Sequence, residues 1–565
     1  MSIEEELKQI MIFIYEGQYK KALLKVEETG KKPGLSDTDT ILLLLRKSEI
    51  LDLMGEYNQA FDIAHHSYQK SKILEKPLLM IDSIVRKSFS LLASHKSEGC
   101  NDLIELAEGM INNVPKAQSN KIKRRKAALY NLQAQIKKNQ GEIDKALEYG
   151  EKSLSLYKEL GMKLESGFAL KLIGSVYVAK GELHRALDYF VEIRNTGEEL
   201  NHMLLRAYSY YTIGGVYLSL GELDQSINYY HKCLALKETL PFTLKENTLN
   251  NIGIALVYKG EINQGLEYYQ QSLALNEAHD NKKAIAINLG NIGEVYVEKE
   301  DLSSASECFK RALDIYRNLE QDWGIAEILY VIMRNFVGNL SPETISSYLD
   351  EFQEIYKRRK DIPLITQKYR LSKAIVLKNN KRLSDKMQAL AIFQEIAKEE
   401  IVWYELTISA LLNQSELLLF ELKTTHDETV LKEVKILSEK LQSISKENNS
   451  YWLLTETYLL QFKLALMELN IESAQELLNE AEKIAKEKNL IKLLKTIAIE
   501  QDLLVNQFED WKRIFDQKPS MRERIELTHL ETLIERMLNK KLYHNEKEIM
   551  EYAHEARNFV AVWGK

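Results

Sequence analysis

The sequence predicts an all-α protein, namely an α-solenoid built from antiparallel helix hairpins. Three observations predict it: a scarcity of glycine and proline, a short motif that recurs about every 40 residues, and apolar residues at helical spacing on both sides of each motif. Glycine and proline number only 24 and 7 among 565 residues. Because turns and strand corners consume these residues, the deficit argues against β-rich, collagen-like and proline-rich disordered proteins.

The recurring motif has six residues and ends on a small one, as in Gly181-Glu-Leu-His-Arg-Ala186. Five copies begin at residues 141, 181, 221, 260 and 300, so the steps are 40, 40, 39 and 40 residues. Two more begin at residues 17 and 55, and Glu98–Leu103 is a degraded copy between them and the main series. Because a single helix hairpin cannot bury its own apolar face, copies of this kind stack into a solenoid.

Each unit is expected to hold two helices, one before the motif and one after it. Before the motif, Leu170, Ile173 and Tyr177 recur at i, i+3 and i+7 and share one helix face. After it, Ala186 and Phe190 do the same at i and i+4. The glycine that opens the motif suits a left-handed cap at the end of the first helix, which glycine adopts at little cost; these glycines are Gly141, Gly181, Gly221 and Gly260.

Small residues recur at two fixed heights in the units. Seven residues before the motif lie Ala134, Gly174, Gly214, Gly253 and Gly293. Five residues after its start lie Ala146, Ala186, Ser226, Gly265 and Ala305. A glycine inside a helix costs ~1 kcal/mol relative to alanine, so its recurrence at one height requires a packing reason. We expect the small residues to let the paired helices approach closely.

These residues resemble the tetratricopeptide repeat family, whose helix-turn-helix units carry small residues at helix contacts and an aromatic residue in each helix. Tyr177, Tyr217 and Tyr296 match the first aromatic position, and Phe190, Tyr230, Tyr269 and Phe309 match the second. The spacing near 40 residues is similar to the long-helix repeats of kinesin light chains and Pins-type adaptors. The resemblance implies a right-handed superhelix whose first helices line a concave groove.

The predicted domain organisation follows the strength of the repeat. Residues 1–320 are expected to form a tetratricopeptide-type solenoid of about eight repeats, most regular over 125–320. Residues 321–518 retain helical periodicity without a clear motif and are interpreted as degenerate hairpins that continue the stack, with helical runs at 364–380, 386–401, 403–423, 427–448, 451–469, 471–488 and 490–510. Residues 519–565 are interpreted as a C-terminal helical cap, with a docking helix for a partner as the alternative.

Composition excludes several classes of function. The net charge of -7 does not favour general phosphate binding. The basic clusters Lys121–Lys126 and Lys357–Lys360 are spread around their helices, so nucleic-acid binding is not expected. Three distant cysteines predict no disulfide framework, and no apolar run approaches the ~20 residues that span a bilayer. The expected location is therefore cytoplasmic.

No sequence motif for catalysis or cofactor binding was found. The sequence lacks a P-loop, a G-x-G-x-x-G loop, H-E-x-x-H, C-x-x-C, G-x-S-x-G and an EF-hand loop. The adjacent His65 and His66 diverge by about 100° on a helix and do not predict a metal site. We therefore expect no catalytic residues, no metal and no cofactor.

The candidate binding residues come from the resemblance, which implies that first-helix asparagines bond the backbone of an extended peptide. An amide offers donors and an acceptor, which matches a peptide backbone. Tyrosines on the same helices are expected to serve as flat apolar walls. The candidate set is Asn131, Lys171, Tyr208, Tyr211, Asn247, Asn250, Asn251, Asn288 and Asn291.

Two functional hypotheses remain open from the sequence. The first is a non-enzymatic scaffold or adaptor that binds a partner peptide or helix in the concave groove. The alternative is a repeat-based sensor that responds to a small molecule or peptide and is linked to transcription or signalling. A divergent helix-turn-helix within residues 521–565 would favour the second hypothesis.

Overall fold

The computed structural model is helical throughout the part of the chain that it describes, and no strand occurs there. The described residues are 3–93, 99–114, 119–140, 142–220, 222–236, 240–360, 362–399, 404–425, 427–447, 450–488, 490–506 and 520–539. They divide into two compact units, one ending at His279 and one beginning at Asp280.

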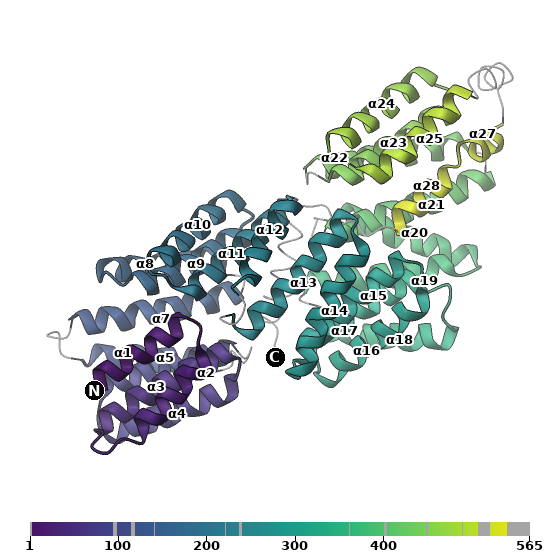
Figure 1. The fold of residues 1–565 in the computed structure, drawn as a ribbon. Coiled ribbons are helices and arrows are strands. Elements are labelled where there is room, and N and C mark those ends of the chain that lie inside the picture. The colour runs from purple at the N-terminus through teal and green to yellow at the C-terminus, as the bar shows by residue number, and fades with distance from the viewer. Residues whose placement is uncertain are drawn as a thin grey trace. The chain divides into compact units, whose positions relative to one another are not determined.

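The first unit consists of helices that alternate between two roles, first helix and second helix of a hairpin (Figure 1). Its first helices are α1 (Ile3–Tyr15), α3 (Asp37–Met54), α5 (Pro77–Ala93), α7 (Ser119–Asn139), α9 (Lys163–Ala179), α11 (Met203–Ser219) and α13 (Phe242–Lys259). Its second helices are α2 (Tyr19–Gly30), α4 (Tyr57–Ile73), α6 (Cys100–Asn112), α8 (Ile143–Glu159), α10 (Leu183–Glu199), α12 (Leu223–Leu234) and α14 (Ile262–Ala278).

The second unit continues the alternation. Its first helices are α15 (Lys282–Glu298), α17 (Asp322–Phe336), α19 (Pro363–Asn379), α21 (Tyr404–Thr425), α23 (Tyr451–Met467) and α25 (Ile491–Asn506). Its second helices are α16 (Leu302–Asn318), α18 (Pro342–Arg358), α20 (Leu383–Lys398), α22 (Glu428–Glu447) and α24 (Ile471–Glu487). Two shorter helices follow, α27 (Met521–Thr528) and α28 (Leu530–Asn539).

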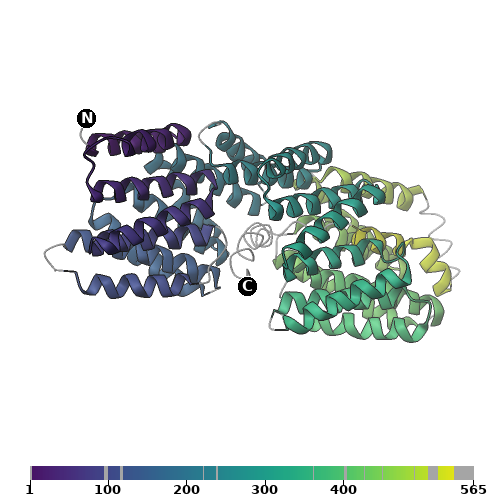
Figure 2. The same ribbon diagram turned by 90° about the horizontal axis from the view of Figure 1, so that it is seen from below.

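The helices of each unit stack as hairpins, which confirms the predicted helical-repeat solenoid. The first and second helices of a hairpin pack against each other, and each second helix packs against the next first helix within its unit. Successive first helices also touch, as α7, α9, α11 and α13 do. Within each unit, Figure 2 shows these helices as successive layers.

The recurring small residues lie where paired helices approach most closely, as the sequence predicted. A methyl group added at Gly174 would overlap the Phe190 ring, and one added at Gly293 would meet the Phe309 ring at 2.7 Å. Gly214 faces Tyr230 at 2.9 Å in the same way. These aromatic rings are themselves fully buried. Glycine therefore makes room for the ring of the second helix.

Left-handed glycines end several first helices. Gly181 and Gly260 have φ angles of 76° and 88°. Earlier in the chain, Gly17 and Gly55 also adopt the left-handed conformation, with φ angles of 72° and 87°. The corresponding glycines at 141 and 221 lie outside the described residues. The motif that begins at Glu300 places a glutamate in this conformation, with φ 61°.

The helical runs expected in the second half correspond to α19 through α25, within a few residues at each end. The domain boundary near residue 320 and the C-terminal cap stay predictions. Helices α27 and α28 lie against α21 and α23. The terminal apolar run from Ile549 to Trp563 lies outside the described residues.

Candidate functional site

We use the term inner face for the side of the first helices that points away from the second helices. Successive first helices contact one another along this side. Two contacts locate it in the first unit. The Lys171 ammonium on α9 lies 3.7 Å from the centre of the Tyr208 ring on α11. Lys138 Nζ on α7 donates to Ser175 Oγ on α9 at 3.3 Å. The inner face thus carries polar and aromatic groups at matching heights on consecutive helices.

Five predicted site residues are partly exposed in the first unit and can be reached from solvent. They lie on α7, α9, α11 and α13, the four most regular first helices of that unit. They are Asn131, Lys171, Tyr208, Asn247 and Asn250.

The remaining four predicted residues are buried. Tyr211 and Asn251 lie on α11 and α13 of the first unit, and Asn288 and Asn291 lie on α15 of the second. Asn251 is only 6% exposed, and its amide donates to the hydroxyl oxygens of Tyr211 at 3.3 Å and Tyr230 at 3.1 Å. This amide therefore joins three helices of the stack, and a ligand would have to compete with both tyrosines for it.

Asn288 and Asn291 are 2% and 6% exposed. They belong to the second unit, whereas the other predicted residues belong to the first. The predicted asparagines are therefore divided between the two units. Asn247 and Asn250 on α13 and Asn131 on α7 are the ones that solvent reaches in the first unit.

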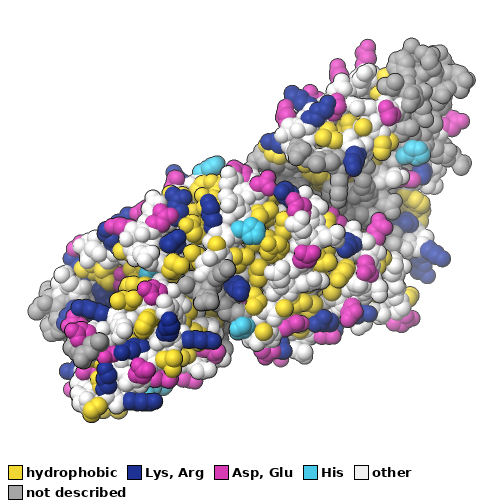
Figure 3. Space-filling view, viewed as in Figure 1, with side chains coloured by type: hydrophobic (Ala, Val, Ile, Leu, Met, Phe, Trp, Pro, Cys, Tyr) yellow, Lys and Arg dark blue, Asp and Glu magenta, His cyan; other side chains and the backbone are white. Residues whose placement is uncertain are grey.

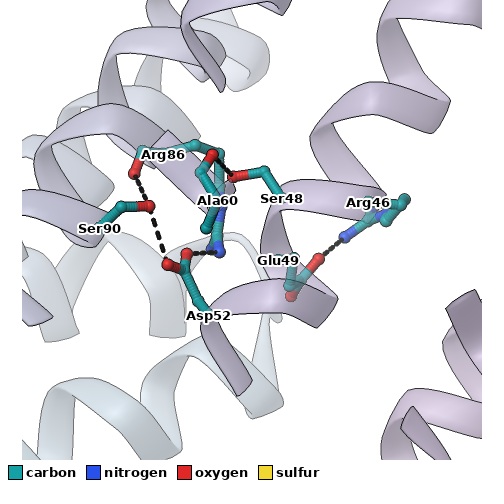
Figure 4. Close-up of polar contacts among 7 residues, drawn as sticks. All are labelled: Arg46, Ser48, Glu49, Asp52, Ala60, Arg86 and Ser90. Carbon is teal, nitrogen blue, oxygen red and sulfur yellow. Dashed lines mark hydrogen bonds and ion pairs between the residues drawn. The ribbon is translucent and has the colours of Figure 1, made fainter. Parts of the chain in front are cut away.

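A cluster of ion pairs lies on α3 and α5, toward the beginning of the inner face (Figure 4). Arg46 donates to the Glu49 carboxylate at 2.5 Å. Burial works to raise the pKa of Glu49, but Arg46 and Arg86 outweigh it and hold that pKa below its ordinary value. The pair stays charged at neutral pH and is only partly shielded from solvent.

Asp52 forms the second ion pair of this cluster. Its carboxylate binds the Arg86 guanidinium and accepts from Ser90 Oγ at 2.8 Å (Figure 4). Burial raises the pKa of Asp52 above its ordinary value, although Arg86 opposes the rise. Arg86 Nε is buried and has no hydrogen-bond partner among the described residues.

The end of α1 lies against the start of α11 within the first unit. The rings of Tyr15 and His202 are 4.7 Å apart, and Phe168 on α9 meets the same histidine edge-on at 6.4 Å. Burial lowers the pKa of His202 to about 4, so the ring is neutral at pH 7. Its Nδ1 accepts from the Leu205 N–H at 3.2 Å and caps α11. Phe168 also meets the Tyr208 ring edge-on at 6.5 Å, so this aromatic group lies beside the contact between Lys171 and Tyr208.

The charged cluster is absent from the predicted site residues, although the repeat register contains a signal for it. The paired small residues lie 12 positions apart, as in Gly214 and Ser226, whose Oγ donates to the Gly214 carbonyl at 2.8 Å. Ser48 Oγ donates to the Ala60 carbonyl at 2.9 Å in the same register. Asn251 was a predicted site residue because it lies two residues before the small residue Gly253. Arg46 lies at the same position, two residues before Ser48.

The described residues hold no group of three or more His, Cys, Asp or Glu side chains arranged for a metal ion. The buried thiols of Cys100 and Cys233 have pKa values raised by burial, to about 11 and about 12. Such thiols are poor nucleophiles at neutral pH. On the face shown in Figure 3, acidic and basic side chains are interspersed. None of the helices in the described ranges has the length and apolarity needed to cross a bilayer.

Two family models match the chain, and both describe the tetratricopeptide repeat. One covers residues 244–318, and the other covers residues 127–160 and 207–240. All three segments lie within the region predicted to be most regular. They cover most of the first helices α7, α11 and α13.

Several solved structures have a similar arrangement of helices. A Rap protein complexed with Competence and Sporulation Factor has a TM-score of 0.46 at 12% identity, with 67% of this chain and 98% of that chain covered. The apo quorum sensor NprR from B. thuringiensis has a TM-score of 0.46 at 14% identity, with 63% and 97% covered. Apo RapI has a TM-score of 0.37 at 11% identity, with 72% and 99% covered. No curated protein sequence matches the chain.

Proposed function

We propose that this chain, which contains tetratricopeptide repeats, is a non-enzymatic interaction protein that binds an extended peptide of a partner on the inner face of its first unit. The observation that carries the proposal is the strip of partly exposed polar and aromatic side chains on α7, α9, α11 and α13. Lys171 and Tyr208 stand at its centre, 3.7 Å apart on consecutive first helices.

The chemistry of this strip suits a peptide in an extended conformation. Asn247 and Asn250 lie on one side of α13, and their amides can donate to and accept from a peptide backbone. The Tyr208 ring offers apolar area for a peptide side chain at a small cost in conformational entropy. The Lys171 ammonium beside it can bind a peptide carbonyl or carboxylate. Solenoid inner faces are extended surfaces of the kind that repeat proteins use for binding.

The test begins with selection of peptides from a random display library on the full-length chain. The selected peptide is then titrated against a Lys171→Ala/Tyr208→Ala double variant by fluorescence anisotropy. We expect its affinity to fall about 10-fold or more, the size of effect seen at interface residues that dominate binding.

The matched control removes a similar cation and ring from a second helix. Lys232 lies 4.5 Å from the ring centre of Tyr229 on α12, away from the inner face. A Tyr229→Ala/Lys232→Ala variant is expected to bind the peptide as the wild type does. Equal affinity of the peptide for both double variants, or failure of the selection to yield any peptide, contradicts the proposal.

A further inference from the structure

One aromatic ring on a first helix of the first unit is open to solvent. Phe89 lies on α5 and is 48% exposed. Most of the other exposed large apolar side chains of this unit lie on second helices, as Leu24, Ile73 and Leu106 do. Single exposed side chains of that kind are normal on protein surfaces. The meaning of the Phe89 ring therefore depends on the face of α5 that carries it.

The repeat register puts Phe89 on the inner face. The small residue of α5 is Ser88, because the thiol of Cys100, which lies 12 positions later, contacts the Ser88 carbonyl at 3.9 Å. Phe89 is the next residue, and Ser175 holds the corresponding position on α9. Ser175 Oγ accepts from Lys138 on α7, which is one of the contacts that locate the inner face. Phe89 thus belongs to the same row of side chains as Ser175.

The other members of this row are polar. The residue after the small position is Glu49 on α3, Gln135 on α7 and Ser175 on α9, and all three are partly exposed. Glu49 accepts from a guanidinium, and the Gln135 amide donates to a neighbouring side chain at 2.9 Å. Phe89 therefore interrupts a polar row with an exposed ring. Aromatic residues are enriched at protein interfaces relative to the rest of the surface.

A fixed guanidinium supports one face of the Phe89 ring. Arg86 lies one helical turn earlier, and its Cζ is 5.2 Å from the ring centre. The same guanidinium pairs with the Asp52 carboxylate on α3, which also accepts from Ser90 Oγ at 2.8 Å (Figure 4). Asp52 is buried, so this support is held in place. The ring consequently loses little conformational freedom when another group packs on it.

Phe89 is continuous with the strip that carries the proposed function. Helix α5 packs against α7, and α7 carries Asn131 of that strip. Packed helices lie about 8–10 Å apart, which an extended chain spans in about three residues at about 3.3 Å each. A peptide that runs along the first helices therefore reaches the Phe89 ring within a few residues of α7.

We infer that Phe89 is a specificity subsite of the inner face, where it takes an aromatic side chain of the bound peptide. This inference rests on the proposed function, because the peptide on α7 to α13 is what brings that side chain to α5. The subsite selects an aromatic residue because a second ring stacks on Phe89 in an offset or edge-to-face arrangement. Such pairs gain stability beyond the apolar area they bury, which an aliphatic side chain does not.

The first test measures the contribution of the ring to affinity. The probe is the peptide selected on the full-length chain from the random display library, titrated by fluorescence anisotropy. We expect Phe89→Ala to lower its affinity about 10-fold, and Phe89→Tyr, which keeps the ring, to bind as the wild type does. The matched control is Leu106→Ala, which removes an exposed apolar side chain from the second helix α6 and should leave affinity unchanged. Equal affinity of the Phe89→Ala chain and the wild type overturns the inference.

The second test identifies the side chain that meets the ring. Each aromatic residue of the selected peptide is replaced by alanine and titrated against the wild-type and Phe89→Ala chains as a double-mutant cycle. At one position, we expect the loss of about 10-fold on the wild type to disappear on the variant. Leucine at that position should restore little of the affinity. Independent losses at every position, full affinity of the leucine peptide, or selected peptides without any aromatic residue overturn the inference.

The inference and the proposed function fail in different ways. Affinity lost by the Lys171→Ala/Tyr208→Ala variant but kept by Phe89→Ala upholds the peptide site and overturns the subsite. Affinity lost by Phe89→Ala alone, with coupling to one aromatic residue of the peptide, upholds the subsite and overturns the strip around Lys171. Affinity kept by both variants overturns both.

Discussion

Replacement of Gly293 by alanine tests the packing rule on which the whole solenoid depends. The added methyl group would lie 2.7, 2.9 and 3.0 Å from three carbon atoms of the Phe309 ring. Phe309 is completely buried, so its ring cannot move aside without displacing its neighbours. Alanine gains ~1 kcal/mol of helix propensity over glycine, whereas overpacking of a core costs ~1–3 kcal/mol. We therefore expect a net loss of stability of up to ~2 kcal/mol.

The control lies three residues earlier in the same helix. A methyl group added at Gly290 would meet only Ile328 Cδ1 at 3.7 Å, which is an ordinary contact. Gly290→Ala should therefore stabilise α15 by up to ~1 kcal/mol. The assay is hydrogen exchange of the α15 and α16 amides, which reports local opening without requiring a two-state transition of the full chain. Stabilisation by both substitutions would refute the packing argument.

Three further predictions concern buried polar groups. Asn251→Ala should lower the free energy of unfolding by about 1–3 kcal/mol, because two buried tyrosine hydroxyls lose a donor. Asn250→Ala should weaken peptide binding; differential scanning calorimetry measures the first effect and anisotropy the second. Asp52→Ala should cost about 3 kcal/mol or more by leaving Arg86 unpaired, and a urea denaturation midpoint equal to that of the wild type would contradict this. Burial raises the pKa of Glu294 to about 8. Between pH 5 and pH 7 the folded chain therefore keeps this proton, whereas the unfolded chain, in which Glu294 has its ordinary pKa, releases it. The free energy of unfolding should therefore fall over this range, by up to about 3 kcal/mol. The Glu294→Gln chain should lack this loss, and parallel pH dependence of the two denaturation midpoints would count against the assignment.

The repeat made the hairpin architecture predictable from sequence. Small residues at fixed heights identify the helix contacts, because only Gly174 or Gly293 leaves room for a ring such as Phe190 or Phe309. Helix ends follow from the same register, since glycine adopts the left-handed cap at residues 181 and 260. These features depend on local spacing, which the sequence displays directly.

Side-chain partners that come from three helices were less predictable. The sequence placed Asn251 on the inner face, but its partners Tyr211 and Tyr230 come from a different hairpin and determine its burial. The Asp52–Arg86 pair joins the successive first helices α3 and α5, so its partners lie 34 residues apart and the motif at Gly55 does not reveal them. The position of α27 and α28 on α21 and α23 depends on contacts far apart in sequence, which no periodicity reports.

The proposed function requires that a peptide binds along the first helices of the first unit. The most direct measurement is a hydrogen-exchange footprint of the full-length chain with and without a selected peptide at saturation. We expect slower exchange in α9, α11 and α13 and unchanged exchange in α8, α10 and α12. Protection confined to the second helices, or no protection in the first unit at saturation, would contradict it.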